Sequence, residues 1–241
     1  MSPKAGTSAQ AAAKKTRQAG MRGSLVALRV TNPKRYADVQ TSERLFPYYA
    51  GYSTGFIEEL LRSVELSKES LTVDPWSGAG TTVHALQKLG LQGLGIDLNP
   101  VMVIAGKAGL LSDRKAPSLM PLAESIVETA LQDDVSMGEN DPLNVWLYAD
   151  NAAGVRKLEG AINKTFISHV HYQQLKTKGT LDQVSQLAAF FYVALFRAIR
   201  RMLRTFVPTN PTWVKRASMP QEKSARRLLQ STTHSLPKNG N

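Results

Sequence analysis

The sequence predicts an α/β protein organised around a parallel β-sheet, and three observations along residues 71–100 support this fold class. A short apolar strand, 71–73, runs into a glycine-rich turn. The segment Thr81–Leu89 then carries apolar residues every three positions, which suits a helix packed on a sheet. A second apolar segment, Leu91–Ile96, completes a strand–helix–strand unit, whose two strands are expected to run parallel.

The turn between the first strand and the helix has the composition of a ligand-binding loop. Pro75 cannot donate to a sheet ladder, so it ends the strand. Gly78 and Gly80 flank Ala79, and their missing side chains allow the backbone to approach a ligand closely. Asp97 follows the second strand. Backbone amides at a helix start, together with a carboxylate placed for ribose hydroxyls, predict a nucleotide-handling unit.

The spacing of this turn differs from two common nucleotide-binding motifs. A phosphate-binding P-loop has Lys after its last glycine, whereas Gly80 is followed by Thr81 and Thr82. The dinucleotide fingerprint has Gly or Ala at its third position, where Val83 stands here. Neither motif describes the turn.

Composition narrows the class of protein further. A length of 241 residues predicts one domain with tails, and 42% hydrophobic residues suffice for a core. The absence of cysteine excludes a disulfide framework and a thiolate metal site. We see no apolar run of membrane-spanning length and no secretory signal, so we expect a cytoplasmic protein without a membrane partner.

The charge distribution favours a polyanionic partner. The net charge is +11, and residues 1–37 hold eight Lys or Arg and no acid. Such an arm is consistent with phosphate contacts, which give affinity without sequence information. A solubilising disordered tail explains the same composition equally well.

Several helices are expected on either side of the strand–helix–strand unit. Ser53 or Thr54 can cap a helix. Its apolar face is formed by Phe56, Ile57, Leu60 and Leu61. Further helices are predicted over Val101–Leu111, Leu122–Leu131 and Leu181–Phe206, with loops over 112–120 and 132–142.

A third strand is predicted over residues 145–148, where four apolar residues follow one another. Asp150 comes just after it. In nucleotide-binding folds of this kind a carboxylate at this place lies near the adenine, although an Asp-Asn turn accounts for Asp150 equally well.

The segment 74–82, DPWSGAGTT, followed by GIDLNP at 95–100, resembles the cofactor-binding motif of amino-group DNA methyltransferases. These enzymes methylate the exocyclic adenine N6 or cytosine N4. Their pattern is D-P-F-x-G-[ST]-G-T-T, then an apolar helix, then G-x-D-x-x-P. Trp76 replaces the usual Phe and Ala79 the usual Ser. The resemblance implies a Rossmann-like methyltransferase fold that binds S-adenosylmethionine (SAM).

The resemblance also implies which residues hold the cofactor. Asp97 would bind the ribose hydroxyls. The segment from Phe46 to Phe56 is similar to the one that packs around the methionine end in this family, although it lacks the usual His. A helix start packed on a sheet explains this segment equally well. The other residues implied around the cofactor are Asp74, Pro75, Trp76, Gly78, Gly80, Thr81, Asn99 and Pro100.

The family carries a second motif, [DNS]-P-P-[YFW], whose polar side chain and carbonyl accept the hydrogens of the target amine while the aromatic ring stacks on the extruded base. The nearest match is Asn210-Pro211-Thr212-Trp213, reached through Phe206-Val207. Thr212 replaces the second Pro. Asn210, Pro211 and Trp213 are therefore the catalytic candidates, and a turn with Trp213 as a packing anchor is the alternative.

The chain after this motif is short. Beyond Trp213 remain 241 − 213 = 28 residues, without a strand-like run. A complete methyltransferase sheet needs about three further strands. We therefore expect an incomplete sheet plus added helices: the cofactor-binding half of the fold, as a fragment or as one part of a split enzyme completed by a second polypeptide.

Two features near the long predicted helix have more than one interpretation. Arg197, Arg200, Arg201 and Arg204 crowd its C-terminal half, which suits the helix dipole; a DNA-facing ridge is the alternative. His169 and His171 are separated by one residue and could lie on the same side of an extended segment. No third ligand stands out, so no metal site is predicted.

The predicted organisation is a basic disordered arm (1–34), a SAM-binding Rossmann-like domain (35–213) with a helical insertion at about 151–206, and a flexible basic tail (214–241). The first functional hypothesis is a SAM-dependent DNA methyltransferase of adenine or cytosine amino groups, in a restriction-modification setting. The alternatives are a non-catalytic remnant that binds SAM and nucleic acid, and an RNA methyltransferase.

Overall fold

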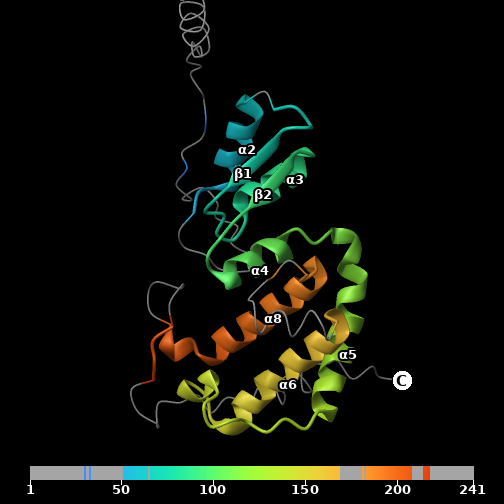
Figure 1. Ribbon diagram of the computed structural model, residues 1–241, viewed down its shortest axis with the longest axis vertical. Coiled ribbons are helices and arrows are strands. Elements are labelled where there is room, and N and C mark those ends of the chain that lie inside the picture. Colours follow the sequence, from blue (N-terminus) through green and yellow to red (C-terminus); the bar gives the residue numbers. More distant parts are fainter. Residues whose placement is uncertain are drawn as a thin grey trace, which may run out of the picture.

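The computed structural model describes residues 30, 33, 51–64, 66–168, 181, 183–207 and 214–217. This part of the chain is mixed α/β and mostly helical, with a two-stranded parallel sheet at one end and a layer of helices at the other (Figure 1). In chain order the elements are α2 (Thr54–Ser63), β1 (Leu71–Asp74), α3 (Thr81–Leu89), β2 (Gln92–Gly95), α4 (Pro100–Gly109), η3 (Asp113–Lys115), α5 (Ala116–Gln132), η4 (Pro142–Val145), α6 (Ala149–Phe166), α8 (Gln186–Met202) and η5 (Arg204–Phe206).

The predicted strand–helix–strand unit is confirmed. β1 and β2 pair in parallel, with Leu71 opposite Gln92 and Asp74 opposite Gly95. The helix between them, α3, has the predicted bounds. Because parallel strands end at the same edge of a sheet, the turn after β1 and the loop after β2 lie side by side.

Helix starts follow the local sequence. The Ser53 hydroxyl accepts a hydrogen bond from Phe56 N at 3.1 Å and caps α2, as predicted. Ser185 caps α8 in the same way, so that helix begins at Gln186 rather than at Leu181.

One face of the sheet packs closely against α3 because β2 presents glycines to it. A Cβ at Gly93 would lie 2.4 Å from Leu86 Cδ1, and one at Gly95 would lie 2.9 Å from Ser77 Cβ. Leu86 is buried together with Ile57 of α2. α2, α3 and this face of the sheet therefore share one small apolar core.

The other face of the sheet is exposed. Side chains alternate along a strand and Val73 pairs with Leu94, so Leu71, Val73, Leu94 and Ile96 share this face. Their exposed fractions are 47–59%. Parallel sheets are normally covered on both faces. In the described part of the chain, helices cover only one face of this sheet.

The helical layer holds the larger part of the described core. α4 packs against α8, and α6 packs against both α5 and α8. Phe166 of α6 stacks on Phe191 of α8 with ring centroids 5.2 Å apart. Lys107 at the end of α4 donates to the carbonyls of Leu181 (2.7 Å) and Val184 (3.1 Å), which joins α4 to the start of α8.

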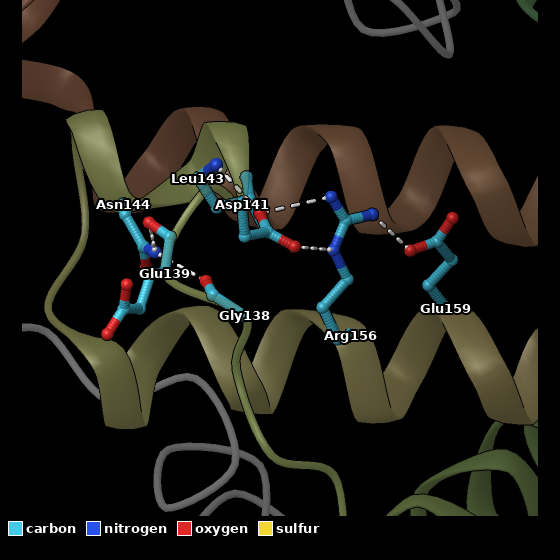
Figure 2. Close-up of polar contacts among 7 residues, drawn as sticks. All are labelled: Gly138, Glu139, Asp141, Leu143, Asn144, Arg156 and Glu159. Atoms are coloured by element: carbon cyan, nitrogen blue, oxygen red, sulfur yellow. Dashed lines mark hydrogen bonds and ion pairs between the residues drawn. The ribbon is translucent and has the colours of Figure 1, made fainter.

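A network of ion pairs connects the loop before η4 to α6 (Figure 2). Arg156 Nε donates to Asp141 Oδ2 at 2.9 Å, and Arg156 Nη1 donates to Glu159 at 2.5 Å. Asp141 also accepts from Leu143 N, and Asn144 donates to two carbonyls of the loop. The Arg156 guanidinium lowers the pKa of Asp141. These groups satisfy one another, which marks the network as structural.

The prediction of a third strand over 145–148 is wrong. Residues Pro142–Val145 form the 3-10 helix η4, capped by the Asp141 carboxylate at 2.9 Å from Leu143 N. Asp150 lies in the first turn of α6. A run of four apolar residues fits a strand or a buried helical turn equally well, and here a cap and a proline precede the run.

The predicted loop over 112–120 is also wrong in its second half. η3 leads directly into α5, which begins at Ala116 and contains Pro121. Pro117 stands at the second helical position, where its missing N–H would have had no intrahelical acceptor, whereas Pro121 lies inside the helix and removes one backbone hydrogen bond. No helix within the described ranges is long and apolar enough to cross a membrane.

We predict that Gly95→Ala destabilises the protein by about 1–3 kcal/mol, because the new methyl group would force Ser77 and β2 apart. Urea unfolding followed by circular dichroism measures this change. Gly55→Ala is the matched control: its Cβ meets nothing within 4 Å and it lies in α2, so it should be neutral or stabilising by up to about 1 kcal/mol. Equal effects of the two substitutions would contradict the close packing at Gly95.

Candidate functional site

The candidate site is the glycine-rich turn between β1 and α3. Gly78 and Gly80 adopt positive φ angles of 53° and 88°, which side chains disfavour. Gly80 precedes α3 without a side-chain cap. The first N–H groups of any α-helix lack intrahelical acceptors, so those at the start of α3 face the turn as hydrogen-bond donors.

The Asp74 carboxylate at the end of β1 lies at one side of this turn. Its Oδ1 accepts from Trp76 N at 3.1 Å. Its Oδ2 accepts from the hydroxyls of Tyr52 at 3.0 Å and Thr82 at 2.5 Å, and these two hydroxyls also contact each other. Burial raises the pKa of Tyr52, which keeps its hydroxyl protonated as a donor. Asp74 is thereby held in a fixed orientation by three donors.

The Asp97 carboxylate lies across the same turn, at the end of β2. Its Oδ2 accepts from Gly78 N at 2.9 Å, and its Oδ1 accepts from Asn99 N at 2.8 Å. Asn99 then caps α4 by accepting from Val101 N at 3.0 Å. A carboxylate has about four lone-pair sites, so each oxygen of Asp97 retains capacity for a further donor.

Helix α4 packs directly against the turn, where Gly106 of α4 lies next to Gly80. A Cβ at Gly80 would lie 3.0 Å from Gly106 Cα and 3.1 Å from His84 Nε2. His84 Nε2 lies 2.9 Å from Gly106 O, so the neutral ring donates to that carbonyl. Gly80 is therefore required twice, for its positive φ and for the approach of α4.

The site is acidic. Two carboxylates flank the turn, and no ion pair within the described ranges involves either of them. Hydroxyl and ammonium groups are the partners that such carboxylates accept, whereas a phosphate would be repelled. Among the described residues, no group of three or more His, Asp or Glu is placed to hold a metal ion.

The structure brings together most of the residues predicted around the cofactor. Asp74, Gly78, Gly80, Thr81 and Asp97 surround the turn. Pro75 and Trp76 form its exposed outer part, and Trp76 is 82% exposed. Asn99 and Pro100 form the start of α4.

The predicted catalytic residues Asn210, Pro211 and Trp213 lie outside the described residues. The chain on either side is placed: Phe206 is buried at the end of η5, and Lys215 N donates to its carbonyl at 2.8 Å. Trp146 Nε1 donates to Lys215 O at 2.8 Å. The last helical residues described before this segment, Arg204–Phe206, form the 3-10 helix η5.

Sequence reasoning missed four residues of the site: Tyr52, Thr82, His84 and Gly106. Tyr52 lies in the segment expected near the methionine end, but nothing singles out its hydroxyl as a partner of Asp74. Thr82 belongs to the recognised motif, and as the second residue of α3 it lies close enough to the end of β1 to donate to Asp74. His84 and Gly106 carry no local signal, because their contact joins two helices.

A glycine-rich turn at a helix start, with carboxylates at the ends of two adjacent parallel strands, offers hydrogen-bond acceptors suited to hydroxyl and ammonium groups. A 58-residue stretch, 24% of this chain, is 36% identical to the Type II methyltransferase M.BsoBI of Geobacillus stearothermophilus. This match covers 11% of that protein's length. No family model and no solved structure matches the chain.

We predict that the stability of the protein falls as pH decreases from about 7 to about 5, in part through His84. Burial lowers the pKa of His84, partly offset by its bond to Gly106, so the folded state favours the neutral ring. The unfolded chain binds a proton near the ordinary pKa of 6.5, which favours unfolding below that pH.

Urea unfolding at several pH values tests this prediction. His84→Gln keeps a donor for the Gly106 carbonyl but does not titrate, so its stability should change less between pH 7 and 5 than that of the wild type. The same pH dependence in both proteins would show that His84 does not contribute.

Proposed function

We propose that this chain binds SAM at the glycine-rich turn, and that it is the cofactor-binding part of a Rossmann-like methyltransferase acting on the exocyclic amino group of adenine or cytosine in DNA. The observation that carries the proposal is the pair of carboxylates, Asp74 and Asp97, held across a turn of two positive-φ glycines. The similarity to a type II methyltransferase supports it.

The residues of the turn fit the parts of SAM. Asp74 would attract the methionine ammonium group, and the first amides of α3 would receive its carboxylate. Gly78 and Gly80 leave room for the backbone to approach the ligand. Asp97 would accept hydrogen bonds from the ribose hydroxyls while its bonds to Gly78 and Asn99 hold it in place. SAM, when bound, supplies an electrophilic methyl group on a sulfonium.

The charge of the site favours SAM over phosphate-bearing nucleotides. SAM carries a sulfonium and an ammonium group, both positive, and two ribose hydroxyls. Asp74 and Asp97 suit these groups, and the same carboxylates oppose a pyrophosphate at the start of α3. The lysine with which a P-loop contacts phosphates is also missing after Gly80.

Methyl transfer also needs groups that orient the target amine. The candidates for this role in the chain, Asn210, Pro211 and Trp213, lie outside the described residues. We also include in the proposal a second polypeptide that carries further strands of the sheet. The exposed face of Leu71, Val73, Leu94 and Ile96 is where further elements of such a sheet would pack.

Isothermal titration of SAM and S-adenosylhomocysteine into the purified chain tests the cofactor site. We expect saturable binding that Asp97→Ala weakens at least about tenfold, because a hydrogen bond to a charged group contributes about 1.5–3 kcal/mol. Asp113→Ala, which removes an exposed carboxylate at η3, is the matched control and should bind as the wild type.

Asp97 also holds Gly78 N and Asn99 N, so its loss could disturb the loop itself. A cycle with a 2′,3′-dideoxyribose analogue of S-adenosylhomocysteine separates the two effects. The analogue should bind the wild type more weakly than the parent ligand does, and the difference should disappear in Asp97→Ala. An undiminished difference in the variant, or no binding by the folded wild-type chain, would overturn the proposal.

A further inference from the structure

The C-terminal end of α8 carries a dense group of cations. From Gln186 to Ala217 the sequence contains no Asp or Glu. The hydrogen bond from Lys215 N to Phe206 O (2.8 Å) brings a later segment back to this end of the helix. We name the resulting group the cationic ridge; its members are Arg197, Arg200, Arg201, Arg204, Lys215 and Arg216.

The helix dipole explains only part of this ridge. Its effect is confined to the last turn of a helix, which contains Arg200 and Arg201. Arg197 lies more than one turn before the end at Met202, and Arg204 lies beyond it in η5.

Three members of the ridge, Arg204, Lys215 and Arg216, have exposed side chains and therefore present their positive charges to solvent. Arginine suits phosphates in particular, because its planar fork can donate two hydrogen bonds to one phosphate group.

The ridge lies toward the end of α4 that carries the candidate cofactor loop. Lys107, in the last turn of α4, contacts the carbonyls just before α8, so the two helices run in opposite directions (Figure 1). α4 has 10 residues and α8 has 17, which correspond to about 15 Å and about 25 Å. The C-terminal end of α8 therefore extends past the N-terminal end of α4, where Asn99 and Pro100 follow Asp97.

We propose that the cationic ridge binds the phosphate backbone of duplex DNA and holds the substrate beside the candidate cofactor loop. This inference rests on the proposed function for the identity of the polyanion. From Arg197 to Arg204 the ridge rises about 10 Å, which corresponds to about three phosphates of one strand at about 3.4 Å per nucleotide. Phosphate contacts position a duplex without reading its sequence, so the sequence preference would come from elsewhere.

Fluorescence anisotropy with a labelled duplex of mixed sequence, at several salt concentrations, tests the ridge in the full chain. The variant Arg204→Gln/Arg216→Gln removes two exposed cations, one from each segment. We expect affinity to fall at least about tenfold at low salt, and the slope of log affinity against log salt to become shallower by about two, at about 0.9 for each phosphate contact.

Two control variants accompany it. Arg114→Gln/Lys115→Gln makes the same change in net charge at two exposed residues by η3, beyond the opposite end of α4, and should alter affinity less than about threefold. Arg204→Lys/Arg216→Lys keeps the charge and should retain most of the affinity. Circular dichroism checks that each variant is folded.

The outcomes separate this inference from the proposed function. If the wild type does not bind duplex DNA, if both Gln variants weaken binding equally, or if an RNA of the same length binds more tightly, the inference is overturned. Titration of SAM into Arg204→Gln/Arg216→Gln should match the wild type. If the wild type does not bind SAM but still binds DNA through the ridge, only the proposed function is overturned.

Discussion

The hydrogen bonds of the Asp97 carboxylate join the two loops on which the site depends. One oxygen accepts from Gly78 N in the turn after β1, and the other accepts from Asn99 N in the loop after β2. Asn99 in turn caps α4, which carries Gly106 against Gly80. The orientation of the turn and the start of α4 thus depend on one side chain at the end of β2, whereas Asp74 is held by its own three donors.

Close backbone approach is the second constraint on this part of the molecule. Gly93 and Gly95 allow α3 to lie against β2, and Gly80 allows α4 to lie against the turn. Such contacts leave no space for a methyl group, so a substitution must move an element rather than a side chain. Gly80 therefore sets both the backbone conformation of the turn and the distance between the turn and α4.

The sheet and the helical layer differ in how completely they are covered. Within the described residues, the helices bury a core that includes stacked Phe166 and Phe191, whereas the sheet has one covered face and one exposed apolar face. Burial of apolar area is the main favourable term in folding. Burial of apolar area therefore stabilises the helical layer more than it stabilises the sheet. The candidate site lies on the sheet, the less stabilised of the two.

The sequence by itself determined the strand–helix–strand unit of residues 71–96, the cap at Ser53 and the residues around the turn, because these depend on neighbours in the chain: glycine, proline and capping residues act locally. It misassigned 145–148, where four apolar residues fit a strand or a turn and only the Asp141 cap and packing against α6 decide. Only the tertiary structure joined Tyr52 to Asp74, His84 to Gly106 and Lys215 to Phe206, because these contacts link segments far apart in the sequence that leave no periodic signal.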